Sequence, residues 1–402
     1  MKYRRFGKLD WKVSALGFGA MRLPTTGGDR AKIDEVVAVR MIRYAIDHGV
    51  NYVDTAYRYH DGNSEILVGK ALKDGYREKV RLATKMPIRL VNTSDDLNRI
   101  FDEQLRKLQT DHIDFYLLHG IRKEGWAKIK ELNVLKWAEK ELANRRIRYL
   151  GFSFHDKFEV FKEVVDGHDG WSFCQIQYNY IDNESSSRTP GTKGLEYATS
   201  KGLAVVIMEP IQGGNLAVKP PAEIQALWDK EKIGMSPAEL ALQWVWNQPE
   251  VSVVLSGMST INQVTENIAS ADRSGPDTLT EKELEFTSKV RERYFSYGFI
   301  GCTGCRYCTP CPNGVAIPEI MALYNQFYAK KDNKNAQLEI VTEYNEKIPA
   351  EKRAETCVRC GECETKCPQQ LPISNLIAKA ARSFKETSEP VGQLRPTEIR
   401  LI

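Results

Sequence analysis

Eight of the nine cysteines in this chain fall into two short runs in its last quarter. The first run reads CTGCRYCTPCP from Cys302, and the second reads CVRCGECETKCP from Cys357. The opening sequence MKYRRFGKLDWKV carries charges throughout and has no apolar stretch typical of a signal peptide, so we expect a cytoplasmic protein with reduced thiols. Reduced cysteines at this close spacing are typical ligands of zinc or of iron–sulfur clusters.

The spacing within the runs favours iron over zinc. Structural zinc usually takes two separated CxxC pairs, whereas CxxCxxC followed by a fourth cysteine and a proline resembles the bacterial ferredoxins. In that arrangement the fourth cysteine binds the other cluster, which implies two [4Fe-4S] clusters here. One feature departs from it, because only Thr309 and Pro310 precede the last cysteine of the first run, where three residues are usual. The implied ligand sets are Cys302, Cys305, Cys308 and Cys367 for one cluster, and Cys357, Cys360, Cys363 and Cys311 for the other.

Length and composition allow a large domain and a small one. The chain has 402 residues, of which 42% are hydrophobic, so it can bury an extended core. The net charge is only +4 and both signs alternate along the chain, which gives no indication of nucleic-acid binding. No apolar run approaches the length of a membrane span. We therefore expect neither nucleic acid nor a membrane as a partner.

Before the cysteine runs, short apolar segments alternate with segments of helical periodicity. One such helix is expected to end at Gly49, and another to begin at Ser236 and Pro237. This alternation predicts an α/β fold, and eight units predict a (β/α)8 TIM barrel, with an open doubly wound sheet as the alternative. No GxGxxG motif follows an early strand, which disfavours the open sheet. The apolar segments are VSALGFGAMRL, NYVDTA, VRLATKM, IDFYLLH, IRYLGFS, FCQIQYN, AVVIMEP and VSVVLSGM.

Changes in composition divide the chain into three predicted parts. They are the barrel over 1–295, a small ferredoxin-like, helix-rich iron–sulfur domain over 296–385, and a polar tail over 386–402. A Gly-Lys turn between short extended runs near the N-terminus predicts a hairpin before the barrel. We expect Ser94 or Asp95 to cap a barrel helix, and Cys174 to be a buried core residue.

Ionisable residues stand at the ends of three successive predicted strands. Asp54 ends the second strand and Tyr59 follows it, Lys85 ends the third, and His119 ends the fourth. Taken singly, each could be a turn cap, a packed ring, a solvent-facing amine or a core histidine. Because the C-terminal ends of barrel strands carry active sites, the four together favour a catalytic site at one mouth.

These four types of side chain suit the reduction of a carbonyl group by hydride. The carbonyl oxygen gains negative charge as it accepts the hydride, so the reaction needs a proton donor and hydrogen-bonding groups. A tyrosine is a better acid when a neighbouring lysine lowers its pKa, and a buried aspartate would hold that lysine in place. Histidine would orient the carbonyl and help to relay the proton. We expect Tyr59 to be the acid in reduction and the base in oxidation.

The segment VNYVDTAYRYHDGNSEILVGKAL, with a supporting Glu65, resembles the signature of the aldo-keto reductases, and LATKMP and DFYLLHG resemble that family's lysine and histidine motifs. The resemblance covers about residues 1–295 and maps the four catalytic positions onto Asp54, Tyr59, Lys85 and His119. It implies a TIM barrel, a small carbonyl or alcohol substrate, and NAD(H) or NADP(H) across the barrel mouth. The implied cofactor-binding residues are Ser153, Gln175, Met208, Pro210, Gly213, Ser256, Gly257, Met258, Gln263, Glu266 and Asn267.

Two positions depart from the family pattern, and both concern the cofactor. Phe154 stands where the family usually has asparagine, and Met208 stands where an aromatic ring often stacks on nicotinamide. A 2′-phosphate is normally bound by arginine or lysine, and the stretch from Leu255 to Asn267 has neither. NADH is therefore as good an expectation as NADPH.

The whole chain resembles aldo-keto reductases with a C-terminal ferredoxin-type extension. A hydride carries two electrons and each cluster passes one, so enzymes that couple them normally use a flavin, for which the sequence shows no motif. The clusters are then either structural or exchange electrons with a ferredoxin-like or flavoprotein partner. A barrel that is only a docking scaffold for an electron carrier is disfavoured by the four catalytic residues. Trp126, Trp137, Tyr57 and Arg58 either line a pocket for a polar ring such as a sugar or pack within the loops.

Overall fold

The computed structural model describes residues 1–296 and 298–388. They form two compact units, the first made of Met1–Val218 and Lys232–Ser288. The second is made of Lys219–Glu231 and the described residues from Lys289 onward, so the division lies within helix α11 (Glu281–Ser296). The first residues of the predicted tail, 386–388, belong to helix α15 (Ile373–Ser388). The rest of that tail lies outside the described residues. None of the described helices is long and apolar enough to cross a membrane.

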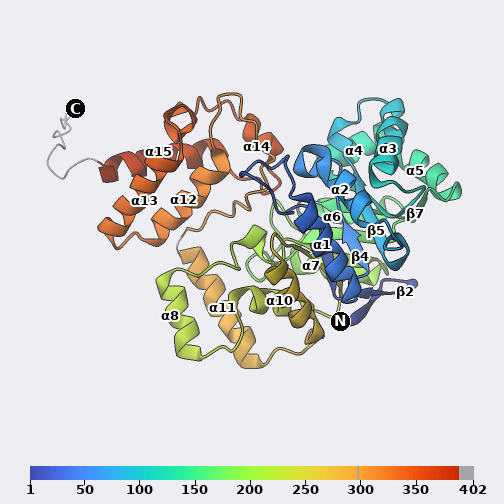
Figure 1. Ribbon diagram of the computed structural model, residues 1–402, viewed down its shortest axis with the longest axis horizontal. Helices are drawn as coiled ribbons and strands as arrows, with labels where there is room; N and C mark the ends of the chain where they lie inside the picture. Colours follow the sequence, from blue (N-terminus) through green and yellow to red (C-terminus); the bar gives the residue numbers. More distant parts are fainter. Residues whose placement is uncertain (297, 389–402) are drawn as a thin grey trace. The chain divides into compact units, whose positions relative to one another are not determined.

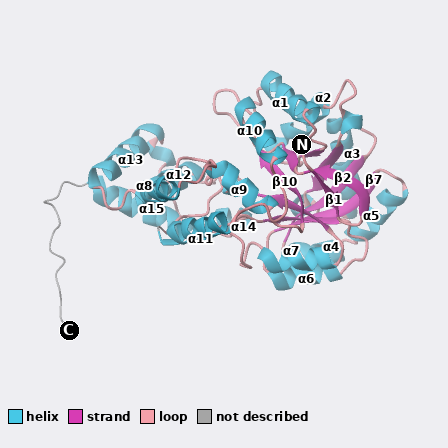
Figure 2. Ribbon diagram, turned by 90° about the horizontal axis from the view of Figure 1, so that it is seen from below, coloured by secondary structure: helices cyan, strands magenta, loops and turns pink. Residues whose placement is uncertain are grey.

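The first unit is a closed barrel of parallel strands in the order β10-β3-β4-β5-β6-β7-β8-β9, with helices around it (Figures 1 and 2). Closure of the sheet confirms the predicted (β/α)8 barrel and excludes the open doubly wound sheet. Each strand begins in one of the eight apolar segments, and only β6 and β7 extend past theirs, by two residues and one residue. The strands are β3 (Leu16–Gly19), β4 (Tyr52–Asp54), β5 (Arg81–Met86), β6 (Ile113–Ile121), β7 (Ile147–Phe154), β8 (Phe173–Gln177), β9 (Ala204–Met208) and β10 (Val251–Gly257).

The ends of the barrel helices follow local sequence signals. Gly49 has a φ of 95° just beyond the first helix, and Ser236 accepts a hydrogen bond from the backbone N–H of Glu239 at 3.2 Å. The expected cap at Ser94 or Asp95 was wrong, since Thr93 is the N-cap and Asp96 returns the bond in a capping box. The helices are α1 (Glu35–Asp47), α2 (Asn63–Ala71), α3 (Ser94–Leu108), α4 (Lys123–Glu131), α5 (Val134–Ala143), α6 (Phe158–Asp166), α7 (Gly191–Ser200), α9 (Pro237–Trp246) and α10 (Ile261–Asp272).

The predicted N-terminal hairpin is present and closes one end of the barrel. Strands β1 (Tyr3–Phe6) and β2 (Leu9–Ser14) pair antiparallel. Phe6 is fully buried, and its ring centroid lies 4.6 Å from that of Phe115 near the start of β6 and 5.7 Å from that of Phe173 at the start of β8. These aromatic side chains fill the N-terminal end of the barrel, and in barrels of this kind the active site lies at the C-terminal end.

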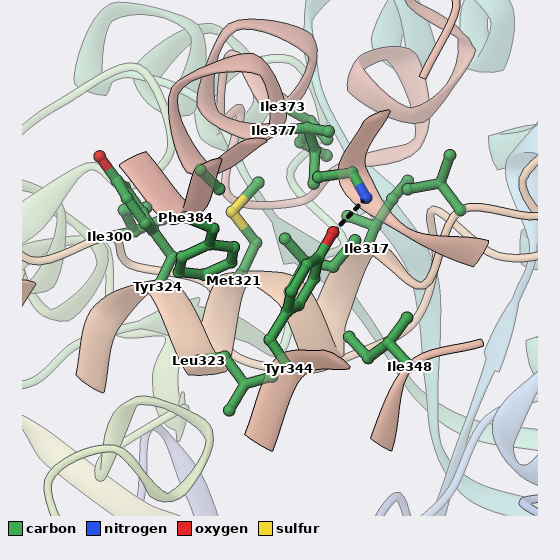
Figure 3. Packing of buried hydrophobic residues seen from close by; sticks show 14 of the residues in the cluster. Ile300, Ile317, Met321, Leu323, Tyr324, Tyr344, Ile348, Ile373, Ile377 and Phe384 are labelled. Carbon is green, nitrogen blue, oxygen red and sulfur yellow. Dashed lines mark hydrogen bonds between the residues drawn. The ribbon is translucent and has the colours of Figure 1, made fainter. Parts of the chain in front are cut away.

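The second unit is helical around its cysteines, as the sequence predicts. Its core is drawn in Figure 3, where the Tyr344 and Phe384 rings lie with their centroids 4.6 Å apart. The Tyr344 hydroxyl accepts a hydrogen bond from the Ala354 N–H at 2.8 Å, and this bond holds the chain that precedes the second cysteine run. The helices are α8 (Ala222–Glu231), α12 (Ile317–Ala329), α13 (Lys334–Lys347), α14 (Glu362–Lys366) and α15.

Candidate active site and cysteine pockets

A buried ion pair lies at the C-terminal ends of β4 and β5. Lys85 Nζ lies 2.6 and 2.7 Å from the two carboxylate oxygens of Asp54, and it also donates to the Thr55 carbonyl at 2.8 Å. Asp54 is 2% exposed and Lys85 is 1% exposed. Burial raises the pKa of Asp54 and lowers the pKa of Lys85, while each charge favours the ionised form of the other. The pair therefore fixes an ammonium group at the barrel mouth.

Tyr59 and His119 lie beside this ammonium group. Tyr59 follows β4 in the short helix η1 (Tyr59–Gly62) and is buried, and its ring centroid lies 5.1 Å from Lys85 Nζ. The rings of Tyr59 and His119 are nearly perpendicular, with their centroids 6.3 Å apart. The structure thus brings together the four residues that the sequence predicts to be catalytic.

His119 is held in its neutral form. Its pKa is lowered well below 6.5, first by burial and then by the charge of Lys85, with smaller effects from His155, Arg89 and Arg58. A neutral imidazole has one nitrogen that donates and one that accepts a hydrogen bond. His119 can therefore donate to a carbonyl oxygen without carrying a charge.

Glu65 supports the site through Gln104, which sequence reasoning missed. Glu65 Oε1 accepts hydrogen bonds from Thr84 Oγ1 at 2.6 Å and from Gln104 Nε2 at 2.8 Å. Gln104 Nε2 also donates to the Lys85 carbonyl at 3.0 Å, and its Oε1 accepts from the Tyr116 hydroxyl at 2.6 Å. These bonds fix the backbone that carries Lys85. The available signal was a polar residue on the otherwise apolar inner face of α3.

Ser153 and Gln175 lie opposite each other on β7 and β8. Ser153 Oγ accepts a hydrogen bond from the Gly120 N–H at 2.7 Å, which leaves its own hydrogen to donate. Gln175 Oε1 is buried and has no hydrogen-bond partner in the described part of the chain. A primary carboxamide needs one donor and one acceptor, so the two side chains fit the amide of nicotinamide. Phe154 points away from this pair, since it packs against Phe161 of α6 at a centroid distance of 5.1 Å.

The remaining predicted cofactor residues follow the last two strands of the barrel. Asn267 Nδ2 donates to Ser256 Oγ at 2.9 Å, and Gln263 Oε1 accepts from the Ser259 N–H at 2.8 Å. These bonds join the end of β10 to the first turns of α10, whereas Glu266 is exposed on that helix. Met208 ends β9, Pro210 and Gly213 lie in the turn after it, Gly257 ends β10, and Met258 is buried just beyond.

Arg22 lies against this same loop, although it is far away in the sequence. A Cβ atom placed on Gly257 would be 3.2 Å from Cβ, Cγ and Cδ of Arg22, so the arginine stem covers the glycine. The Arg22 carbonyl accepts a hydrogen bond from Ser259 Oγ at 2.7 Å. The stretch from Leu255 to Asn267 has no basic residue of its own, but the fold places one directly upon it. Sequence spacing gave no signal for this contact.

The aromatic residues considered for a substrate pocket each have partners within the barrel. Trp137 Nε1 donates to Asn98 Oδ1 at 2.8 Å, and the Tyr57 hydroxyl donates to Glu103 Oε2 at 2.8 Å. Trp126 is buried against Gly167. Cys174 is fully buried in β8, as expected, and burial raises the pKa of its thiol.

The eight clustered cysteines surround two pockets in the second unit. No cysteine of the chain forms a disulfide, and all nine are among the described residues. The cysteines are grouped crosswise, as the ferredoxin resemblance implies, because the last cysteine of each run lines the pocket formed mainly by the other run. One pocket is lined by Cys302, Cys305, Cys308 and Cys367, and the other by Cys311, Cys357, Cys360 and Cys363.

The chemistry of these pockets fits iron–sulfur clusters. Their remaining lining is largely apolar, and Ile317 and Ile373 line both pockets. Burial, and then the neighbouring thiols of Cys305, Cys302 and Cys367, raise the pKa of Cys308 to about 12. Thiolates in such a place need a bound cationic centre to remain ionised. Among the described residues, no group of three or more histidine, cysteine or acidic side chains is close enough together to bind a single metal ion. The cysteines are instead spread around each pocket.

Comparison with known proteins identifies a family for the barrel and another for the cysteine-containing region. Residues 15–278 match the aldo/keto reductase family, and residues 301–372 match the 4Fe-4S dicluster domain. The aldo-keto reductase AKR11C1 from Bacillus halodurans, in its holo form, superposes with a TM-score of 0.59 at 29% identity, over 72% of this chain and 96% of that one. An aldo-keto reductase from Klebsiella pneumoniae in complex with NADPH gives a TM-score of 0.57 at 27% identity, over 72% and 95%.

Two curated relatives carry names that describe an activity. The L-galactose dehydrogenase of Arabidopsis thaliana is 28% identical over 71% of this chain and 93% of its own length. The NADH-specific methylglyoxal reductase of Escherichia coli (strain K12) is 25% identical over 67% and 93%. These relatives are oxidoreductases by name. The chain therefore belongs to the aldo/keto reductase family and carries a 4Fe-4S dicluster domain after its barrel.

Proposed function

We propose that the barrel reduces an aldehyde or ketone, or oxidises the corresponding alcohol, with NAD(H) or NADP(H) and with Tyr59 as general acid and base. The observation that carries this proposal is the position of Tyr59, whose buried ring lies beside the ion-paired ammonium of Lys85 and the neutral ring of His119. A phenol in this place can release a proton because the phenolate that remains has a cation next to it.

In the proposed reaction, bound nicotinamide supplies the hydride to the carbonyl carbon. Tyr59 Oη gives its proton to the carbonyl oxygen, and the ammonium of Lys85 stabilises the phenolate that remains. Asp54 keeps Lys85 charged and in place, and the neutral ring of His119 donates a hydrogen bond to the same oxygen. Ser153 and Gln175 hold the carboxamide of the cofactor and so set the orientation of its ring. Oxidation of an alcohol follows the same proton path in reverse.

Both nucleotides remain in the proposal. One similar structure is titled as a complex with NADPH, and one relative is named an NADH-specific reductase. Arg22 supplies a basic group next to the loop after β10, which the sequence stretch itself lacks. A guanidinium there favours a phosphate of the nucleotide. We therefore propose NADPH before NADH, in a protein that works in the cytoplasm.

We propose that the second unit binds two [4Fe-4S] clusters and that they stabilise its fold. Ile317, Ile373, Ile377 and Met321 belong to the buried core of this unit, and the same side chains line the cysteine pockets. Loss of the clusters would open this core to water. Exchange of electrons with a ferredoxin-like or flavoprotein partner is the alternative, and the exposure of Cys360 is the observation that favours it.

The Tyr59→Phe variant tests the catalytic proposal. It removes the acidic proton and keeps the ring, so we expect the rate of carbonyl reduction to fall by about 10²- to 10⁴-fold. Binding of NADPH, followed by quenching of protein fluorescence, should persist. The control is Tyr57→Phe, which removes a hydroxyl bonded to Glu103 and should keep the rate. Unchanged reduction by Tyr59→Phe would show that the proposed chemistry is wrong.

The visible spectrum of anaerobically purified protein tests the role of the clusters. A brown band that NADH or NADPH leaves unchanged is expected for structural clusters. Bleaching of that band by the nucleotide would show that the two units exchange electrons, and would favour a redox partner and a bound flavin. A colourless protein that contains zinc would exclude both readings.

A further inference from the structure

Four successive strands of the barrel are each followed by a basic side chain within four residues. Arg58 comes four residues after the end of β4, and Arg89 comes three residues after the end of β5. Arg122 and His155 directly follow β6 and β7. Because these strands are parallel neighbours in the barrel, their C-terminal ends lie side by side. The four basic groups therefore occupy the part of the barrel mouth that holds the proposed catalytic residues.

Local structure fixes the backbone of each basic residue. Arg58 directly precedes Tyr59, and Arg89 lies in the short helix η3 (Ile88–Leu90). The carbonyl of Arg122 accepts the hydrogen bond of the Trp126 N–H at 2.8 Å in the first turn of α4. The His155 N–H donates to the carbonyl of Ile121 at 3.0 Å, which places His155 beside Arg122. These residues thus belong to the rigid rim of the barrel.

The charges of the three arginines act on a common region. Arg89 and Arg58 contribute to the lowered pKa of His119, and Arg122 and Arg89 contribute, after burial, to a pKa of about 3 for His155. Arg89 therefore lies within electrostatic reach of both histidines, and both rings are neutral at neutral pH.

Two other charged groups near these arginines have partners within the barrel. The charge of Lys85 is balanced by Asp54. The carboxylate of Asp156, next to His155, accepts hydrogen bonds from the backbone N–H groups of Lys123 at 3.0 Å and of Lys157 at 2.8 Å. Arg58 and Arg89 are exposed and Arg122 is half-buried. The three guanidinium groups add positive charge to this side of the barrel mouth.

We propose that the substrate is a carbonyl compound with an anionic group, a carboxylate or a phosphate, which Arg58, Arg89 and Arg122 bind at the barrel mouth. This inference names the substrate class of the proposed reductase and rests on that function. A guanidinium group binds either anion through two parallel hydrogen bonds, and so fixes its direction as well as its position. An anion held at the rim would position the carbonyl group of a short substrate towards Tyr59.

Two matched pairs of carbonyl compounds test the inference. Succinic semialdehyde is compared with butanal, and glyceraldehyde 3-phosphate with glyceraldehyde, each with NADH and with NADPH. We expect kcat/KM for the anionic member of at least one pair to exceed that of the neutral member by about 10-fold or more. The pair that shows the preference identifies the anion as carboxylate or phosphate. Added salt should reduce the preference, because it screens the arginine charges.

Substitution of the arginines links the preference to these side chains. Arg89→Ala and Arg122→Ala should each lower the ratio of kcat/KM for the anionic substrate to that for the neutral one by about 10-fold. Arg89→Lys should restore part of the ratio. The control is Arg106→Ala, which removes an exposed arginine from the last turn of α3, at the other end of the barrel, and should leave the ratio unchanged.

The outcomes separate this inference from the proposed function. If both members of each pair are reduced equally well, or if Arg89→Ala and Arg122→Ala leave the ratio unchanged, the inference is wrong and the reductase proposal stands. If none of the four carbonyl compounds causes oxidation of NADH or NADPH, although the nucleotide binds, the reductase proposal fails and the substrate class fails with it.

Discussion

Cys367 lines the same pocket as Cys302, although the other three cysteines of its run line the second pocket. The first run shows the reciprocal feature, since Cys311 lies with the second run. Each pocket therefore takes residues from two chain segments about fifty residues apart. A cluster bound in either pocket would join the two segments, and each segment alone would supply only part of the ligands.

Cys367→Ser should remove one of the two proposed clusters. The pocket of Cys302 would lose a ligand while the other pocket keeps its four, so iron should fall from about eight to about four atoms per chain. Cys311→Ser should have the same effect on the other pocket. Iron analysis and the visible absorption of anaerobic protein measure both results. The control is Cys174→Ala, which changes a cysteine buried in β8 and should keep all the iron.

Thiol alkylation of the single variant Cys367→Ser distinguishes the crosswise arrangement from one in which each run binds its own cluster. If each run bound its own cluster, Cys367→Ser would lose the cluster of the Cys357 run and keep the cluster of the Cys302 run, and Cys311→Ser would do the reverse. In the crosswise arrangement, Cys367→Ser should make Cys302, Cys305 and Cys308 open to thiol alkylation and should leave Cys360 protected. Alkylation of the Cys357 run in that variant would contradict the crosswise assignment.

The Asp54–Lys85 pair should stabilise the barrel only while both partners are present. Asp54→Asn leaves a buried ammonium without its counter-charge, so we expect the free energy of unfolding to fall by about 3 to 5 kcal/mol. The double variant Asp54→Asn/Lys85→Met should recover part of this loss. Urea unfolding measures both. The control is Asp47→Asn, which breaks the exposed pair of Asp47 and Lys79 and should cost less than about 1 kcal/mol. A small effect of Asp54→Asn would show that the buried lysine is neutral.

Those parts of the candidate site that depend on strand order or on local residue spacing could be predicted from the sequence. Asp54, Lys85 and His119 could be placed together because each lies within two residues of the C-terminal end of a barrel strand, and the closed parallel order makes strand ends converge. The cysteine pockets followed from the repeat of one spacing. Helix caps were predicted less reliably, since Thr93 and not the neighbouring Ser94 has the extended backbone of an N-cap.

Contacts between distant segments could not be predicted where neither segment carries a motif. Arg22 and Gly257 meet because β3 and β10 are neighbours where the barrel closes, and nothing in either local sequence indicates the contact. Gln104 reaches the backbone of Lys85 from a neighbouring helix. Arg89 lies in the short helix η3 and Arg122 directly precedes α4, and neither belongs to a motif, so their common position appears only once the strand order is known.

Arg22→Ala should weaken nucleotide binding at the loop after β10. Because the Arg22 stem covers Gly257, the arginine lies beside the residues after β10 that are proposed to bind the cofactor. We expect the Kd for NADPH to rise by about 10-fold and the Kd for NADH to rise less, since only NADPH carries the extra phosphate. Fluorescence titration measures both constants. An equal rise in Kd for both nucleotides would place the Arg22 side chain at the pyrophosphate. Unchanged Kd values would show that Arg22 does not contact the cofactor.

His155 should make the stability of the barrel depend on pH. Its pKa is lowered from 6.5 to about 3, first by burial and then by Arg122 and Arg89. Above pH 6.5 the ring is neutral in both the folded and the unfolded chain, and its contribution to stability is fully present. Between pH 6.5 and about 3 only the unfolded chain binds the proton. The free energy of unfolding should therefore decrease as the pH is lowered through this range, by up to about 1.4 kcal/mol per pH unit.

His155→Gln isolates this dependence, because glutamine has no proton to bind in this range. Below pH 6.5 the free energy of unfolding of the variant should fall less steeply than that of the unsubstituted chain, and the two slopes should agree above it. His119, whose pKa is also lowered, is present in both proteins and cancels in the difference. The control is His48→Gln, at an exposed position on the end of α1, which should keep the original slope. Equal slopes for His155→Gln and the unsubstituted chain would mean that His155 binds a proton equally well in the folded and the unfolded chain, and that burial and the charges of Arg122 and Arg89 do not lower its pKa.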